Sequence, residues 1–436
     1  MKLKQRLGDF RVRELLRREY LGADGAHRVY RVTKRKCTSE EAARALAEEA
    51  GVEHGEVHLA GLKDRQGLTI QYMSLARGRE VHLSTGELKI EPVGFAATPL
   101  TSADSLGNAF ELTVRALTRH DLYCLRTNLP RLRVHGTLNY FDDQRFGNLT
   151  HGQGWIYKGL CLGETGAALR RLLGARSPRD DERHRRFKDG LERHWGDWRE
   201  CRDDAGRFGA HHSIFEHLAK HPEDFAGAFQ HVATRLKLIH LFAWQSHLWN
   251  RALAEWLRTL LPVDERVVLE SEEGPLITFS EAPPAALVSS GRLSLPGERL
   301  EGVTDALQRA LFTEVLNQEG LTPEGMAVEV GGFHLKSEER ELFVRPAHLR
   351  VRPPEPDNLN PGFSSVRVRF ELPRGSYATL VIRRLLAEAL GERRAFEQAR
   401  RERGAESVAP PERSPRAPRG SEPRERGDRG GPGRQR

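Results

Sequence analysis

Alternating hydrophobic and polar positions in the first third of the chain predict strands. In "HRVYRVTK", residues 27–34, Val29, Arg31 and Thr33 fall on one face and the residues between them on the other, as in a half-buried strand. The same period of two predicts further strands at residues 56–60, 67–76, 86–96 and 109–117. Residues 61–67, "GLKDRQG", are predicted to form the turn between two of these strands.

A helix is predicted between the first two strands, at "TSEEAARALAEEAG". Thr38 or Ser39 is placed to be the N-cap, glutamates occupy the first turn, and Gly51 ends the pattern. Strands that alternate with a helix in this way indicate an α+β fold with a mainly antiparallel sheet.

The pattern becomes mostly helical after about Gly154. Residues 182–207 are densely charged with helical spacing, and residues 225–261 carry apolar side chains at spacings near 3.6. A run of that length without a cap predicts two helices or one bent helix. Residues 283–302, "PPAALVSSGRLSLPGERLEG", are predicted to be rich in loops.

Strand alternation returns in residues 364–373, "SSVRVRFELP", after a Pro-rich turn at residues 352–362. Gly375 and Ser376 then lead into a helix with leucines on one face. We therefore expect a sheet domain made from both chain ends and interrupted by a mostly helical insertion. The expected boundaries are residues 1–154 and 336–391 for the two parts of the sheet domain, 155–335 for the insertion and 392–436 for a tail.

The net positive charge of the chain is concentrated near its C-terminus. The formal net charge is +8, which suggests a polyanionic partner because Lys and Arg release counterions from phosphate backbones. Residues 407–436 hold eight arginines against four acids and no aromatic residue, so the tail carries about half of that charge. We expect the tail to be disordered and solvated, with loose capture of RNA as the alternative.

Cysteine and histidine spacings do not favour a metal site. The four cysteines are far apart and form no C-x-x-C pair, so neither a zinc knuckle nor a disulfide framework is expected; they are Cys37, Cys124, Cys161 and Cys201. His217 and His221 are one turn apart, but "HLAKH" lacks the glutamate of the H-E-x-x-H pattern. No apolar run reaches the ~20 residues of a membrane helix, and a reducing cytoplasm is expected.

Asp64 lies in the "GLKDRQG" turn between two bases, Lys63 and Arg65. A lone acid in such a turn is by default a surface residue. The flanking bases need not face its carboxylate, because successive side chains of extended backbone point to opposite sides. If Asp64 is a nucleophile, it needs a positive partner from elsewhere and a partly dry pocket.

A second stretch, "GTLNYFDDQRFGN", mixes aromatic rings with amide and guanidinium groups. Asn139 and Arg145 lie beside Phe141 and Phe146, and a nucleobase binds to such a mixture through stacking and edge contacts. The alternative is that Phe141 and Phe146 are core residues and Arg145 a structural charge.

A third stretch, "QSHLWN", falls on the predicted helix of residues 225–261. Leu248 and Trp249 are expected to pack in the core, and Asn250 to make structural hydrogen bonds.

Together these stretches resemble the TruD family of transfer-RNA pseudouridine synthases. "AGLKDRQGLTIQYMS" resembles the catalytic motif of that family and "NYFDDQRFG" its second motif. "QSHLWN" and "LPRGSYATLVIRRL" resemble later signatures, while "GDFRVREL" and "LGNAFELTVR" also match. The matches run in family order from about Lys4 to Leu390.

The resemblance implies a pseudouridine synthase catalytic domain interrupted by the family's TRUD insertion. It implies isomerisation of uridine to pseudouridine in tRNA, with uridine 13 as the family's best-known target, by base flipping and without metal or cofactor. A monomer that binds tRNA is expected. The alternatives are the same reaction on ribosomal or messenger RNA, and an RNA-binding protein whose active site has decayed.

The resemblance also assigns roles to individual residues. Asp64 matches the catalytic aspartate, which acts either at C1′ or on the 2′ proton, and Lys4 matches its cationic partner. Phe10, Asn139 and Tyr377 match residues of the uridine pocket, and Phe141 matches the stacking ring. Arg145 is expected among the basic residues that bind the RNA backbone. Asp142 and Asp143 depart from the family, which usually has glycine after the stacking phenylalanine.

Overall fold

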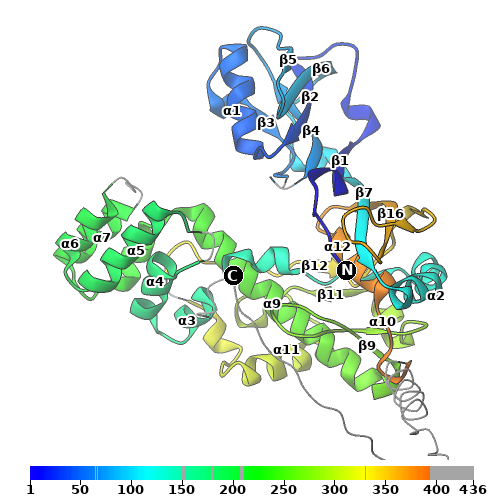
Figure 1. The fold of residues 1–436 in the computed structure, drawn as a ribbon. Coiled ribbons are helices and arrows are strands. Elements are labelled where there is room, and N and C mark those ends of the chain that lie inside the picture. The colour runs from blue at the N-terminus through cyan, green and yellow to red at the C-terminus, as the bar shows by residue number, and fades with distance from the viewer. Residues whose placement is uncertain are drawn as a thin grey trace, which may run out of the picture. The chain divides into compact units, whose positions relative to one another are not determined.

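The structure, a computed structural model, describes residues 1–392 except residues 64, 66, 150–153, 178–179, 207–210 and 329. The described residues belong to one unit, residues 1–392 (Figure 1). The predicted basic tail lies, from residue 393 onward, outside the described residues.

A ten-stranded sheet uses strands from both ends of the chain. Its order is β14-β16-β7-β1-β4-β2-β6-β5, with β15 paired to β16 and β3 to β4. The β1–β4 pair is parallel and the other pairs of this sheet are antiparallel, which confirms the predicted α+β class. The strands are β1 (Phe10–Leu16), β2 (His27–Arg35), β3 (His58–Leu59), β4 (Leu68–Leu75), β5 (Leu83–Ser84), β6 (Leu88–Ala96), β7 (Ser105–Leu117), β14 (Ala347–Val351), β15 (Glu355–Pro356) and β16 (Ser364–Pro373).

Helices α1 (Ser39–Ala50), α2 (Arg119–His135) and α12 (Ala378–Leu386) bury apolar side chains of this sheet in two separate cores. Helix α1 packs its alanines and Leu46 against Tyr30 and Val32 of β2. Helices α2 and α12 form a second core with β7 and β16. The neighbouring strands β1 and β4 join these cores, because Phe10 and Val12 of β1 pack in the second core and Met73 and Leu75 of β4 pack in the first.

Helix α1 forms where the sequence predicts it. Thr38 is the N-cap and accepts a hydrogen bond from the Glu41 amide, while the Glu41 carboxylate accepts one from the Thr38 amide. Gly51 ends the helix in the left-handed conformation, at φ 73°, which glycine adopts without a steric penalty.

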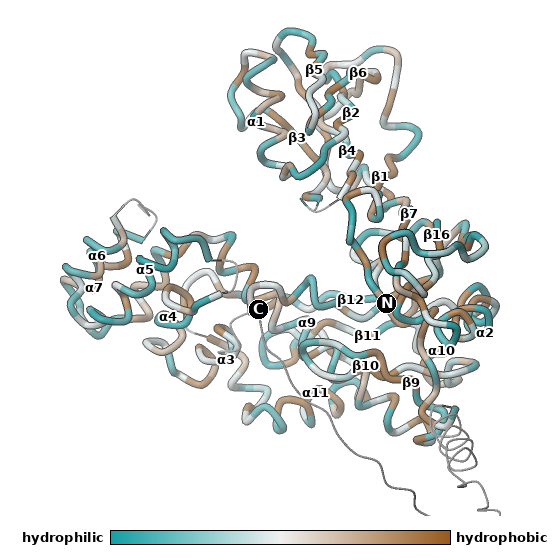
Figure 2. Tube along the Cα trace, viewed as in Figure 1, coloured by the Kyte–Doolittle hydropathy of each residue, from teal (hydrophilic) through white to brown (hydrophobic). Residues whose placement is uncertain are grey.

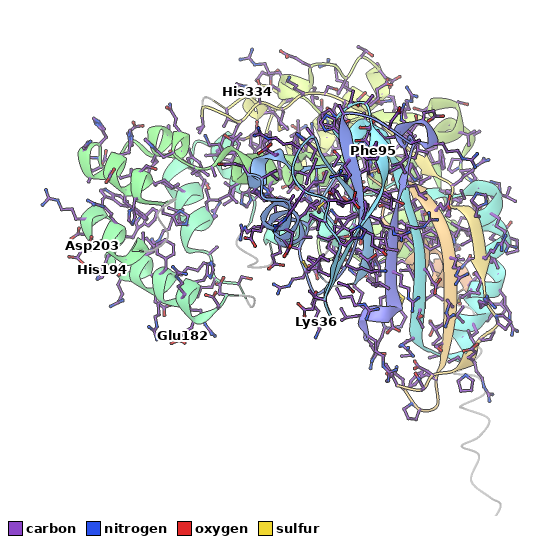
Figure 3. All side chains as sticks on the ribbon, turned by 90° about the horizontal axis from the view of Figure 1, so that it is seen from above. Lys36, Phe95, Glu182, His194, Asp203 and His334 are labelled. Atoms are coloured by element: carbon purple, nitrogen blue, oxygen red, sulfur yellow. The ribbon has the colours of Figure 1, made fainter. Side chains whose placement is uncertain are left out.

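The middle of the chain is mostly helical. Figure 3 labels Glu182, His194 and Asp203, which lie on two of its helices. The helices are α3 (Ile156–Cys161), α4 (Thr165–Gly174), α5 (Glu182–His194), α6 (Trp198–Ala205), α7 (His212–Lys220), α8 (Phe225–Gln230), α9 (Thr234–Leu260), α10 (Ala285–Ser290) and α11 (Ala306–Gln318). Residues 225–261 thus form two helices, as one of the two predictions had it. The central helix α9 buries Trp244, Leu248 and Trp249.

Three short antiparallel pairs lie outside the large sheet. They are β9 (Arg266–Leu269) with β10 (Leu276–Phe279), β11 (Arg292–Ser294) with β12 (Glu339–Glu341), and β8 (Thr137–Leu138) with β13 (Phe343–Val344). The prediction of a loop-rich segment at residues 283–302 was partly wrong, because that segment contains α10 and β11. The local sequence pattern could not predict these two elements. Strand β11 pairs with a strand more than forty residues away. Burial of Leu287 in α10 and of Leu293 in β11 fixes both elements.

Hydrophobic and hydrophilic segments are interleaved along the trace (Figure 2). Among the described residues, no helix is both long enough and apolar enough to cross a membrane.

Candidate active site

A small cavity lies where β1, β4 and β7 meet the residues that precede α12. Its volume is about 220 Å³. Among the residues that line it are Phe10 on β1, Lys63 before β4, and Tyr377 at the N-cap of α12. The cavity therefore brings together two predicted pocket residues and the immediate neighbour of Asp64.

Asp64 itself lies outside the described residues, but the positions on both sides of it are held in place. The Lys63 ammonium pairs with the buried Glu14 carboxylate at 2.8 Å, and the Lys63 amide donates to Ser39 Oγ at 2.9 Å. Arg65 Nε donates to the Lys36 carbonyl at 2.8 Å. The two flanking bases thus hold the turn to β1 and to the end of β2.

Gly67 brings this turn close to β1. A Cβ atom at position 67 would lie 2.9 Å from the Phe10 carbonyl oxygen, closer than real side chains allow. The parallel register pairs Leu68 with Arg11 directly after this approach. A glycine is needed here for the space it leaves.

Lys4 lies next to the cavity, with its ammonium 4.2 Å from the centroid of the Phe10 ring. Two backbone hydrogen bonds between Lys2 and Arg115, of 2.8 and 2.9 Å, tie the start of the chain to β7. Lys4 has a left-handed backbone at φ 58°, uncommon for a residue with a side chain. Although Lys4 is close to the N-terminus, it is placed by tertiary contacts on both sides.

Arg115 also holds two buried carboxylates. Its guanidinium pairs with Asp9 at 2.8 Å and with Asp357 at 3.0 Å. Burial by itself would raise the pKa of Asp357, but hydrogen bonds from the Ala116 and Leu359 amides, and from Asn360 and Arg115, outweigh it and hold that pKa below its usual range. This network joins the segment before β1 to β7 and to the turn before β16.

Asn139 and Phe141 lie behind the cavity wall and are not among the residues that line it. Arg340 donates to the Asn139 carbonyl at 2.9 Å, to Asn139 Oδ1 at 3.0 Å and to the Gly375 carbonyl at 2.9 Å. Its guanidinium covers the Phe141 ring at 3.9 Å from the ring centroid. Burial lowers the pKa of Arg340 to about 10.

Phe141 is a buried residue that touches the site through Tyr377. Its ring is 6.4 Å from that of Tyr377 and 5.7 Å from that of Trp249. Asn250 accepts from the Phe141 amide at 2.9 Å and donates to the Phe141 carbonyl at 2.8 Å, which confirms its structural role. Phe146 is buried too, so both rings belong to the core.

Asp142 and Asp143 face α12. Asp142 accepts a hydrogen bond from Thr379 and lies 3.2 Å from Arg383, which also pairs with Asp143 at 2.5 Å. Burial raises the pKa of Asp142. Burial by itself would also raise the pKa of Asp143, but hydrogen bonds from Ser271 and Arg383 outweigh burial, so the pKa of Asp143 is lowered. Neither residue has a positive φ, so the backbone here does not need glycine.

Arg145 lines a second, open groove of about 600 Å³ that shares Gln144 and Tyr377 with the cavity. Its Nε donates to Ser246 Oγ at 3.1 Å, and its guanidinium is 5.6 Å from the centroids of both the Phe141 and Phe242 rings. Phe242 is 39% exposed. Cationic and exposed aromatic groups thus lie side by side next to the cavity.

Three buried polar atoms of the cavity lining have no hydrogen-bond partner in the described part of the chain. They are Thr69 Oγ1, Asn108 Oδ1 and Ser376 Oγ. Buried polar groups are normally paired, because an unpaired one keeps its desolvation cost. The cavity lining therefore holds polar groups that can still form hydrogen bonds.

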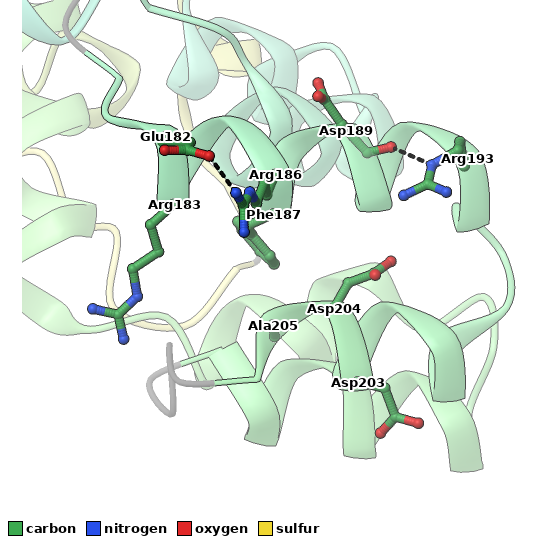
Figure 4. Close-up of a pocket in the computed structure, with 9 residues that line it drawn as sticks. All are labelled: Glu182, Arg183, Arg186, Phe187, Asp189, Arg193, Asp203, Asp204 and Ala205. Carbon is green, nitrogen blue, oxygen red and sulfur yellow. Dashed lines mark hydrogen bonds and ion pairs between the residues drawn. The ribbon is translucent and has the colours of Figure 1, made fainter.

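A larger cleft of about 830 Å³ lies between α5 and α6, away from these residues (Figure 4). Its lining combines three arginines with four acids, and Glu182 already pairs with Arg186 (Figure 4). Acids in that number oppose the binding of a phosphate backbone. Size alone does not make this cleft the candidate site.

Sequence reasoning missed Glu14, Asn108 and Arg340. Glu14 shares the face of Phe10 and Val12 in the period-two pattern of β1, which would have placed its carboxylate inward. Asn108 is a polar residue in the quoted "LGNAFELTVR" stretch. No local signal distinguishes Arg340 from the other arginines.

Comparison with known proteins identifies the family. The model of the family "tRNA pseudouridine synthase D (TruD)" matches residues 1–385. "Probable tRNA pseudouridine synthase D 2" of Methanocaldococcus jannaschii is 30% identical over 88% of this chain and 91% of its own length. The tRNA pseudouridine synthase D of Aquifex aeolicus is 27% identical over 88% of this chain and 98% of its own length.

A solved structure has the same fold. The crystal structure of a candidate TruD protein from Methanosarcina mazei superposes with a TM-score of 0.64 at 24% identity, covering 88% of this chain and 93% of that one. The fold, the family match and the order of the motifs along the sequence agree. The chain belongs to the TruD family of tRNA pseudouridine synthases.

Proposed function

We propose that this chain isomerises uridine to pseudouridine in tRNA, with uridine 13 as the target and Asp64 as the catalytic carboxylate. The observation that carries the proposal is the cavity of about 220 Å³ between Phe10, Lys63 and Tyr377. Ligand pockets commonly start near 300 Å³, so this cavity suits one everted pyrimidine better than a larger ligand.

The reaction is a bond exchange without redox change. The C1′–N1 bond breaks, uracil rotates, and a C1′–C5 bond forms, while C5 loses its hydrogen and N1 gains one. Asp64 either attacks C1′ or removes the 2′ proton to start this sequence. The cavity walls hold the detached base during its rotation.

Charge placement supports Lys4 as the partner of Asp64. The Lys63 ammonium is already neutralised by Glu14, and Arg65 is engaged by a backbone carbonyl. The positive charge that keeps Asp64 ionised must then come from elsewhere. Lys4 is adjacent to Phe10, which lines the cavity, and we assign this role to it.

We propose that the RNA backbone runs along the groove that holds Arg145 and Arg235. In the described part of the chain no carboxylate pairs with Arg145, so its charge is available to a phosphate. Residues 155–335, which include α9 with Arg235, are proposed to be the insertion that extends this RNA-binding surface.

The test uses tRNA transcripts that contain [5-³H]uridine, because formation of the C1′–C5 bond releases the tritium. Wild-type protein should release one tritium per tRNA with uridine at position 13 and none when that position is cytidine. Asp64→Asn should release none while binding tRNA nearly as well as wild type.

Asp24→Asn is the matched control, since Asp24 is an exposed turn residue, and it should keep full activity. Retained activity in Asp64→Asn would refute the role of Asp64. Release from the cytidine-13 transcript would refute the target position. A wild-type protein that binds tRNA and releases no tritium from any RNA would leave the decayed RNA-binding protein as the correct alternative.

A further inference from the structure

We infer that Asn108, assisted by Thr69 and Ser376, binds the polar edge of the target uracil. The inference rests on the proposed function and adds specificity-determining residues to it. It starts from the unpartnered atoms of the cavity lining, which come from three separate elements: β4, β7 and the segment before α12.

The sheet register places two of these side chains on the face that looks into the cavity. Asn108 lies opposite Glu14 across the β1–β7 pair, and Thr69 lies opposite Val12 across the β1–β4 pair. Val12 and Phe10 share that face of β1 with Glu14 and also line the cavity. The third atom, Ser376 Oγ, belongs to the residue next to Tyr377.

The amide of Asn108 suits the uracil edge. Uracil presents an N3–H donor between two carbonyl acceptors, and an asparagine side chain offers one acceptor and two donors. Asn108 Oδ1 is buried without a donor, so it is placed to accept N3–H. The hydroxyls of Thr69 and Ser376 can donate to a carbonyl or to the ribose.

The other asparagine near the cavity is already engaged. Asn139 Oδ1 accepts from Arg340 at 3.0 Å, and Asn139 Nδ2 donates to the Glu341 carbonyl at 3.2 Å. Asn139 also lies outside the cavity lining. Of the two asparagines, Asn108 is the one that lines the cavity and has a side-chain oxygen without a hydrogen-bond partner.

An unpaired buried polar group destabilises the free protein, and a ligand removes that cost by completing the hydrogen bond. Replacing such a group with an apolar one of similar size should leave stability unchanged or raise it, and should harm only function. A structural asparagine behaves in the opposite way, because its removal leaves internal partners unsatisfied. This contrast separates a binding role from a structural one.

The experiment compares Asn108→Leu with Asn128→Leu. Asn128 on α2 is a buried amide whose ends are both engaged, by Arg384 at 3.0 Å and by the carbonyls of Leu385 and Ala387. For each variant the melting temperature and the kcat/KM for tritium release from tRNA are measured, the latter well below the melting temperature.

We expect Asn108→Leu to melt at or above the wild-type temperature and to lose about 10- to 100-fold in kcat/KM. Asn128→Leu should melt lower and keep its kcat/KM. Thr69→Val, which removes another unpaired hydroxyl at constant volume, should also keep its melting temperature and lose activity.

A lowered melting temperature for Asn108→Leu, or wild-type kcat/KM in that variant, overturns the inference. Unchanged kcat/KM in Thr69→Val would remove Thr69 from the proposed contact. These outcomes require an active wild-type protein, so failure of the inference differs from failure of the proposed function, in which wild type itself releases no tritium.

Discussion

At the residue scale, the two bases beside Asp64 hold the turn that carries it. Lys63 contacts Glu14 on β1, and Arg65 contacts the backbone that follows β2. Glu14 also accepts a hydrogen bond from the Tyr72 amide at 3.0 Å, so one buried carboxylate links β1 to two points near β4. These contacts bear on the role proposed for Asp64, because small displacements of a catalytic group lower rates strongly.

Glu14→Gln tests this placement. Glutamine has nearly the same shape as glutamate but carries no charge. The Lys63 ammonium, whose side chain is 12% exposed, would then lack its counter-charge. Removing one partner of a buried pair is expected to lower the free energy of unfolding by about 3 kcal/mol and to reduce kcat more than it raises KM. Urea unfolding and tritium-release kinetics measure the two effects.

The matched control is Glu91→Gln, which removes the partner of Arg31 in an exposed pair. This substitution should lower the free energy of unfolding by less than about 1 kcal/mol and leave kcat unchanged. Equal losses of unfolding free energy and of kcat in the two variants would show that Glu14 has no special role in placing the turn.

At the scale of elements, the site depends on one parallel contact in an otherwise antiparallel sheet. Strands β1 and β4 run side by side, so the turn before β4 arrives at the start of β1, next to Phe10. Gly67 permits this approach because it has no side chain. The order of elements along the chain does not by itself indicate that these two strands are neighbours.

Gly67→Ala is therefore expected to displace β4 relative to Phe10. The added methyl group would lie 2.9 Å from a backbone oxygen, which cannot rotate away. A loss of about 1–3 kcal/mol in unfolding free energy and at least a tenfold loss in kcat/KM are expected. Gly86→Ala, where a Cβ atom meets nothing within 4 Å, should change stability by less than about 0.5 kcal/mol. Wild-type activity in Gly67→Ala would contradict the close approach.

At the scale of the whole molecule, the network around Arg115 fastens the N-terminal segment, and with it Lys4, to strands from both ends of the chain. Asp9, Arg115 and Asp357 are far apart in sequence and form one buried cluster. Because the pKa of Asp357 is lowered in the folded protein, folding favours its ionised form. The resulting stability is fully present above about pH 4, the unfolded value of an aspartate, and is lost as the pH falls below it.

Asp357→Asn should accordingly destabilise the protein at pH 7 and lose less stability than wild type on acidification. The difference in urea midpoint between the two proteins should narrow from pH 5 to pH 3. Asp24→Asn, an exposed substitution, should follow the wild-type curve. A constant difference between wild type and Asp357→Asn across this range would show that ionisation of Asp357 is not what stabilises the fold.

Much of the site could be anticipated from the sequence. Phe10 and Tyr377 were predicted for the pocket and both line the cavity, while Arg145 lies in the adjoining groove. Asn139 and Phe141 were also predicted for the pocket, yet they lie behind its wall under Arg340. The roles of all these residues, and of Asp64 and Lys4, stay predictions for the experiments above.

The family and several of the main helices and strands could be predicted from local sequence patterns. Period and capping residues specify α1 and six strands, because helical and extended backbones impose different spacings on side chains that must be buried; these strands are β2, β3, β4, β6, β7 and β16. Three features became visible only in the folded chain: the parallel pairing of β1 with β4, the buried Glu14–Lys63 pair, and the unpaired atoms of Thr69, Asn108 and Ser376. A residue's own segment indicates which face it lies on, but its partner comes from a distant segment, and that partner is fixed only when the whole chain packs.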